Sequence, residues 1–252
     1  MQFNITNKSI IDLSKIFSPT ILKELCSTGN SKKLRKILDE LNLLYQVDLK
    51  KNLESFFNDV YKILLKNYRN EYIYRSIIIK KILLGIHSLN TAHLINECRV
   101  GNSKADCVIL NGTSTVYEIK TQFDTFSRLH SQLDDYKKAF EYVYIVVPIE
   151  TLKKLEGYNL DENIGIMVLN KNSTISKTRL AKSNKNYFNK ETIFDILRKN
   201  EYIEIISKYY EIPSIPNTKI YTYCKRLFTE LDTELIHAEL VQILKKRDVS
   251  DL

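Results

Sequence analysis

Three short β-prone segments, joined by Gly101-Asn102 and by Asn111-Gly112, constrain the fold of this chain more than any other feature. Both dipeptides are typical of the tight turns that connect antiparallel strands. The three segments cover residues 93–100, 105–110 and 115–120. The pattern therefore predicts a three-stranded meander near the middle of the chain.

The residues after the meander predict the rest of a sheet. Ser127 to Phe140 has helical periodicity, whereas Tyr142 to Val147 and Ile164 to Leu169 are continuous apolar runs suited to strands that are covered on both faces. The expected order is helix, three strands, helix, strand, strand. We therefore expect an α/β fold with a mixed central sheet flanked by helices.

Helical patterns occupy both ends of the chain. Ser31 can cap a helix that begins at Lys32, and amphipathic patterns follow over 49–67 and 70–84. A polar stretch at 171–186 is typical of a loop or linker, and the pattern after it is helical again. The expected organisation is a helical N-terminal region over 1–67, a core over 68–170, and a loop with C-terminal helices that pack on the core over 171–252.

The composition is that of a soluble globular protein. Hydrophobic residues make up 44% of the 252 residues and charged residues 27%, and the 6 glycines and 4 prolines leave little room for low-complexity tracts. The formal net charge of +8 makes a polyanion such as nucleic acid a natural partner. Charge alone does not decide this, because Lys-, Asn- and Ile-rich composition also accompanies AT-rich genomes.

Cysteine and histidine spacing argues against structural metal centres. The four cysteines form no CxxC pair and the four histidines form no i,i+4 pair, so neither a zinc site nor an iron–sulfur cluster is expected. The sequence has no apolar run of the kind found in a signal peptide or a membrane span. We therefore expect a cytoplasmic protein with reduced thiols.

Two of the predicted strands carry charges among apolar neighbours. Asp106 begins an otherwise apolar strand, and Glu118 and Lys120 close the next one. Because side chains alternate along a strand, Glu118 and Lys120 lie on the same face. Burial of either charge without a partner would cost roughly several kcal/mol. A common partner is therefore expected for them.

A divalent cation would be such a partner. Mg²⁺ or Mn²⁺ prefers carboxylate and carbonyl oxygens and retains waters that a substrate phosphate can displace. Asp106, Glu118 and the main chain of Ile119 are the candidate ligands, and Lys120 would hold a water or stabilise charge on the scissile phosphate. The alternative is that Asp106 only ends a hairpin and that Glu118 and Lys120 form an exposed edge pair.

The order of these residues resembles the PD-(D/E)XK, or restriction-endonuclease-like, nuclease superfamily. The core of that superfamily has a strand bearing Asp, a strand bearing (D/E)xK, a helix and a further strand, and residues from about 70 to 170 have this order. Ala105 stands before Asp106 where the superfamily name has Pro, a departure that many members share. The resemblance implies a restriction-endonuclease-like core and a nuclease that requires Mg²⁺ or Mn²⁺.

The helix after the second charged strand extends the resemblance. Gln132 and Tyr136 match the QxxxY pattern of RecB-type exonucleases, and residues four apart share a helical face. By this resemblance the two side chains would contact a DNA phosphate or fix Lys120. The alternative is a half-buried tyrosine packed on the sheet beside a surface glutamine.

Two residues compete for the additional acid that is usual in this superfamily. If Gly101-Asn102 is a two-residue turn, Glu97 falls directly opposite Asp106, where it would be a third carboxylate beside the metal. Glu71, on the helix before the meander, resembles the first-helix acid of many members. Alternatively, Glu71 is a first-turn glutamate that the helix dipole favours. The sequence leaves both candidates open.

The function implied by this resemblance is Mg²⁺-dependent hydrolysis of DNA phosphodiester bonds, in bacterial or phage-related defence, repair or mobile elements. RNA is not excluded as the substrate, although the sequence has no recognisable RNA-binding motif. The rival interpretation is an inactive module of the same fold that binds nucleic acid or a protein. Intact Asp106, Glu118 and Lys120 argue against it, because buried charges without a function would only lower stability.

Overall fold

The fold is that of a computed structural model, which describes residues 7–41, 53–86 and 91–247. The chain divides into two units, Met1–Ser76 and Ile77–Leu252. The sequence pattern put the first boundary at residue 67. The structure instead assigns most of α5 (Glu71–Ile78) to the N-terminal unit.

The N-terminal unit is helical. Ser31 accepts a hydrogen bond from the main-chain N–H of Leu34 (3.1 Å) and so caps the helix that begins at Lys32, as predicted. The start of the helix predicted over 49–67 lies outside the described residues. The helices of this unit before α5 are α1 (Asn7–Ser14), the 3-10 turn η1 (Lys15–Phe17), α2 (Pro19–Thr28), α3 (Lys32–Glu40) and α4 (Leu53–Asn67).

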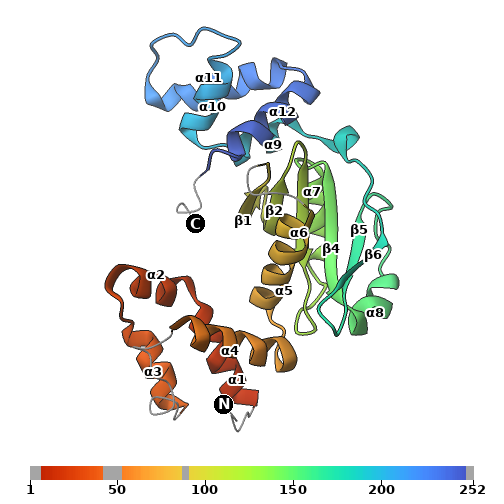
Figure 1. Ribbon diagram of the computed structural model, residues 1–252. Helices are drawn as coiled ribbons and strands as arrows, with labels where there is room; N and C mark the ends of the chain where they lie inside the picture. The colour runs from red at the N-terminus through yellow and green to blue at the C-terminus, as the bar shows by residue number, and fades with distance from the viewer. Residues whose placement is uncertain (1–6, 42–52, 87–90, 248–252) are drawn as a thin grey trace. The chain divides into compact units, whose positions relative to one another are not determined.

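The second unit contains a six-stranded mixed sheet, whose strands lie side by side in chain order (Figure 1). The first three strands pair antiparallel, the third to fifth pair parallel, and the sixth pairs antiparallel with the fifth. The predicted α/β class and mixed sheet are confirmed, and five strands match the predicted segments closely. The strands are β1 (His93–Val100), β2 (Ser103–Leu110), β3 (Ser114–Ile119), β4 (Tyr142–Pro148), β5 (Gly165–Leu169) and β6 (Ile175–Arg179).

Strand β6 corrects the loop that the sequence predicted at 171–186. It pairs with β5, with Ile175 opposite Leu169, and it forms one edge of the sheet. Ser176, Lys177 and Thr178 are exposed. An edge strand has only one paired side, and lysine is common there because it discourages pairing with other chains. The polar composition of this strand is what made it look like a linker.

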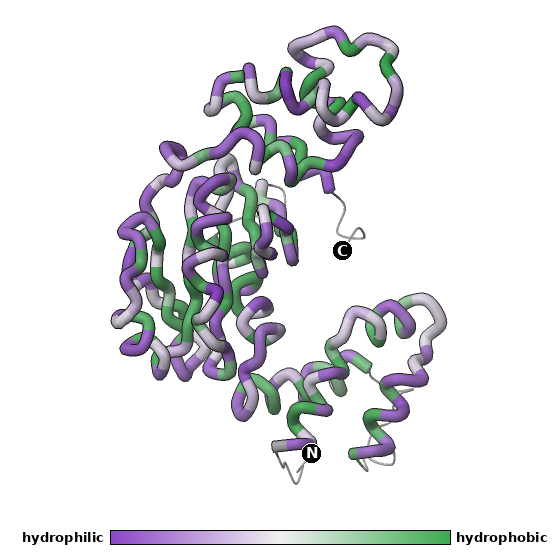
Figure 2. Tube along the Cα trace, turned by 180° about the vertical axis from the view of Figure 1, so that it is seen from behind, coloured by the Kyte–Doolittle hydropathy of each residue, from purple (hydrophilic) through white to green (hydrophobic). Residues whose placement is uncertain are grey.

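Helices cover both faces of the sheet (Figure 1). Helix α7 (Leu129–Lys137) packs on one face, and the π-helical turn η2 (Ile79–Leu83) and α6 (Leu84–Ile86) lie over the other, where Ile82 and Ile86 line a pocket with Met167. The strands contain long hydrophobic runs, drawn in green in Figure 2. The short turns η3 (Ile149–Thr151) and α8 (Leu152–Glu156) follow β4, and η4 (Lys185–Tyr187) follows β6.

Four C-terminal helices share one hydrophobic core with the sheet. The sequence predicted helix after residue 186, and the first part of that helical region is divided into two helices that are separated at Leu197 and Arg198. Phe194 and Phe228 are fully buried, and their ring centroids lie 5.3 Å apart. These helices are α9 (Lys190–Ile196), α10 (Lys199–Ile206), α11 (Asn217–Glu230) and α12 (Thr233–Leu244).

Replacing Phe228 by alanine should lower the free energy of unfolding by about 3–5 kcal/mol, because a fully buried ring is lost from this shared core. Urea unfolding measures the change. Leu180→Ala is the control, since that side chain is 66% exposed and its loss should change stability by less than about 0.5 kcal/mol. Equal effects of the two substitutions would contradict a core shared by the helices and the sheet.

All four cysteines are free thiols, as expected, and only Cys26 is exposed. Burial raises the pKa of Cys98 to about 11. At pH 8 a thiol reagent should therefore label Cys26 in the native protein and all four cysteines after denaturation, because the reactive thiolate is scarce at buried sites. Mass spectrometry of the labelled peptides checks this. Rapid labelling of Cys98 in the native protein would contradict its burial.

Candidate active site

The two charged segments lie on neighbouring strands. Strands β2 and β3 pair with Cys107 opposite Tyr117, and continuing this register by one residue puts Asp106 opposite Glu118. Directly opposed residues of an antiparallel pair project from the same face. At this point the main-chain N–H of Ile119 donates to Oδ2 of Asp106 (2.7 Å). The side chain of Asp106 is thereby anchored to β3.

Glu118 is a buried carboxylate with both oxygens engaged. Its Oε1 lies 2.8 Å from Nζ of Lys120, and its Oε2 lies 2.8 Å from the hydroxyl of Tyr136. The residues Glu118 and Lys120 are 1% and 9% exposed, so the alternative of an exposed edge pair is wrong. Burial of the negative charge is tolerated because an ammonium and a hydroxyl compensate it directly.

Lys120 is held between two acceptors at the end of β3. Its Nζ contacts Oε1 of Glu118 and donates to Oε1 of Gln132 (2.8 Å). Its main-chain N–H donates to the carbonyl of Val146 on β4 (3.0 Å). Gln132 therefore contacts the lysine, which was one of the two roles expected for it.

Tyr136 lies beneath this group and is fully buried. The proton of its hydroxyl is shared between Oε2 of Glu118 and the main-chain oxygen of Lys104 (2.9 Å). Burial raises the pKa of Tyr136 well above its usual value, and the negative charges of Glu118 and Asp106 raise it further. The hydroxyl therefore stays protonated and remains a donor, and both carboxylates lie near enough to influence it.

Helix α7 also holds the β1–β2 turn. Oδ2 of Asp135 accepts hydrogen bonds from the main-chain N–H of Asn102 (3.2 Å) and from the hydroxyl of Ser103 (2.8 Å). Gly101 has a φ of +56°, and a Cβ there would come within 3.0 Å of Asp135. The role of Asp135 could not be predicted from the sequence, because no spacing rule relates a helical acid to a turn more than thirty residues earlier.

The two candidates for an additional acid lie in different settings. The turn has the predicted register, with Val100 opposite Ser103, but Glu97 has a φ of +58° and is exposed, and its carboxylate pairs with Lys104 (2.9 Å). Glu71 belongs to the N-terminal unit, where it forms an ion pair with Arg75. Within the described ranges, no three His, Cys, Asp or Glu side chains form a group that could hold a metal ion.

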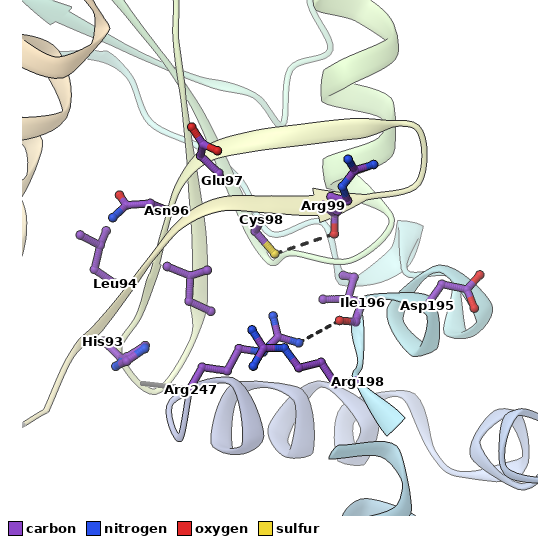
Figure 3. A pocket seen from close by; sticks show the side chains of 11 residues that line it. His93, Leu94, Asn96, Glu97, Cys98, Arg99, Asp195, Ile196, Arg198 and Arg247 are labelled. Carbon is purple, nitrogen blue, oxygen red and sulfur yellow. Dashed lines mark hydrogen bonds between the residues drawn. The ribbon is translucent and has the colours of Figure 1, made fainter. Parts of the chain in front are cut away.

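The edge strand β1 lines a cavity of about 360 Å³ together with the C-terminal helices (Figure 3). Arg247 lines it and donates from Nε and Nη2 to the carboxylate of Glu201 and from Nη2 to the carbonyl of Ile196 (2.9 Å). Asp106, Glu118 and Lys120 do not line this cavity. The cluster of Asp106, Glu118 and Lys120 is therefore a separate site, where the start of β2 lies beside the end of β3.

Residues 65–251 match the model of the bacteriophage P4 protein cII family. The chain belongs to this family. The matched range contains all six strands and every residue of the candidate site. Protein cII of Enterobacteria phage P4 is 28% identical over 125 residues, which are 48% of this chain and 47% of that protein. The chain thus matches about half the length of this curated relative.

Two solved structures show distant similarity. A Silicibacter pomeroyi protein of unknown function aligns over 55% of this chain and 94% of its own, with 13% identity and a TM-score of 0.34. Pyrococcus furiosus SfsA, solved in complex with Ca²⁺, aligns over 44% of this chain and 62% of its own, with 17% identity and a TM-score of 0.26. Both are too distant to inform the chemistry.

In the described part of the chain, no helix has the length and apolar character needed to cross a membrane.

Tyr136→Phe should lower the free energy of unfolding by about 1–3 kcal/mol, because it leaves Oε2 of Glu118 and the carbonyl of Lys104 without their common donor. Tyr144→Phe is the matched control, since Tyr144 is also buried but stacks on Tyr117 and has no hydroxyl partner among the described residues. Chemical denaturation of both variants measures the difference. A Tyr136→Phe protein as stable as wild type would refute the bridging role.

Proposed function

We propose that this member of the P4 cII family is a metal-dependent nuclease that hydrolyses DNA phosphodiester bonds. The observation that supports this most is the gathering of Asp106, Glu118 and Lys120, which Gln132 and Tyr136 contact from α7. This grouping supports the proposal because Asp106, Glu118, Lys120, Gln132 and Tyr136 are the residues on which the PD-(D/E)XK resemblance rests. The net charge of +8 favours a polyanionic substrate.

The donor set suits a hard divalent cation. Mg²⁺ is commonly bound by one or two carboxylates and keeps several waters, so Asp106 and Glu118, with the carbonyl of Ile119, are enough to hold it. All of these candidate ligands are oxygen donors, which suit Mg²⁺ or Mn²⁺ better than a cation that prefers thiolate or imidazole. When bound, the metal would lower the pKa of an attacking water and neutralise charge on the phosphate.

The protein side chains prepare the site for that chemistry. The Tyr136 hydroxyl keeps its proton and therefore fixes the orientation of Glu118 through Oε2. Gln132 gives Lys120 a second acceptor, so the ammonium stays in place when Oε1 of Glu118 turns toward a cation. Lys120 would then donate to the attacking water or to a phosphate oxygen as negative charge develops.

Lys120→Ala should abolish cleavage while leaving most DNA binding intact, because the ammonium acts on the transition state and many other cations contribute to affinity. The assay incubates linear, circular and single-stranded DNA with Mg²⁺, Mn²⁺ or EDTA under single-turnover conditions. Lys177→Ala is the control, since that lysine is exposed on the edge strand β6. Cleavage by Lys120→Ala at the wild-type rate would show that Lys120 is not catalytic.

A folding defect must be separated from a catalytic one. Removing Lys120 alone leaves Glu118 as a buried charge without its cation, which costs about 3–5 kcal/mol. The double variant Glu118→Gln/Lys120→Met removes both charges and should fold, yet it should not cleave DNA. Wild-type protein that binds DNA but cleaves none of the substrates with either metal would instead favour an inactive binding module.

A further inference from the structure

Two apolar side chains are exposed beside the proposed active centre. Phe123 is 56% exposed and follows Lys120 in the loop after β3. Ile149 is 41% exposed and directly follows β4. Strands β3 and β4 are parallel neighbours with Ile119 beside Val146, so the residues that follow them leave the sheet at the same edge. Phe123 and Ile149 therefore follow strands that end at the same edge of the sheet as Lys120.

The loop that carries Phe123 is held to the end of β3 by hydrogen bonds. The main-chain N–H and the hydroxyl of Thr121 both donate to Oδ2 of Asp124, each at 2.7 Å. Thr121 is 4% exposed, and its hydroxyl oxygen accepts the N–H of Phe123 (3.2 Å). The exposed ring is thus attached to a buried anchor that adjoins Lys120.

From this placement we propose that Phe123 is a stacking platform for an unpaired nucleobase of the substrate strand. The inference rests on the proposed function, because a phosphodiester bound at Lys120 brings its own sugar and bases to the surface around it. Aromatic side chains stack on any base, since every base has a π-face. Bases inside a duplex are already stacked on their neighbours. The substrate class is therefore a single-stranded or frayed DNA strand.

The chain has no tryptophan, so Phe123→Trp introduces a single indole at the platform. Its fluorescence is titrated in EDTA with a single-stranded oligothymidylate and with an abasic strand of the same length and charge. The oligothymidylate should quench the indole strongly, and the abasic strand should not. Leu180→Trp is the matched control, because Leu180 is 66% exposed and follows β6, two strands away from β4 in the sheet. Its fluorescence should change little with either strand.

Phe123→Ala should weaken binding of single-stranded DNA by about tenfold, whereas Phe123→Tyr should bind like wild type. Fluorescence anisotropy of labelled DNA measures both. Equal quenching by the two strands, or DNA bound without quenching, would overturn the platform even if Lys120-dependent cleavage is observed. Selective quenching without any cleavage would support the platform and reject the nuclease. A protein that neither binds nor cleaves DNA would reject both.

Discussion

Glu118 has 1% of its surface exposed, and a carboxylate buried to that degree needs compensation on every side. Lys120 provides the opposite charge, and Tyr136 provides a hydroxyl that burial and nearby carboxylates keep protonated. Each partner is held in turn, because Gln132 accepts from Lys120 and the carbonyl of Lys104 shares the Tyr136 proton. The arrangement around the candidate site follows from the need to satisfy this one charge.

Helix α7 is the element on which that compensation depends. Within one short helix, Gln132 contacts the lysine, Tyr136 contacts the glutamate, and Asp135 holds the turn between β1 and β2. The same helix buries Leu129 and Leu133 in the core that the C-terminal helices share. Leu129, Leu133 and Tyr136 lie on one face of the helix, so the residues that orient the site and those that pack in the core are neighbours on one element.

The sequence was sufficient to predict five of the six strands and the residues that contact one another around Glu118 and Lys120. Turn dipeptides and alternation predicted β1 to β3, and continuous apolar runs predicted β4 and β5, because burial on both faces leaves a strong hydrophobic signal. Alternation alone put Glu118 and Lys120 on one face. Helical periodicity put Gln132 and Tyr136 together, and both contact that pair.

What the sequence could not predict depends on tertiary contacts. Strand β6 is polar because it is an edge, and it therefore resembled a loop. The left-handed backbone at Glu97 leaves no signal in a strand of ordinary composition. The exposure of Phe123 depends on hydrogen bonds from Thr121 to Asp124, which only the folded loop brings together.

The central claim is that Asp106 and Glu118 jointly hold a divalent cation. A crystal structure with Mn²⁺ at a concentration that supports cleavage tests it most directly, because anomalous scattering locates the ion without reference to activity. The account predicts one strong peak at about 2.0–2.2 Å from a carboxylate oxygen of each residue, with the Lys120 ammonium moved off Oε1 of Glu118 and still bonded to Gln132. Mn²⁺ bound only elsewhere, with the Glu118–Lys120 contact unchanged, would contradict it.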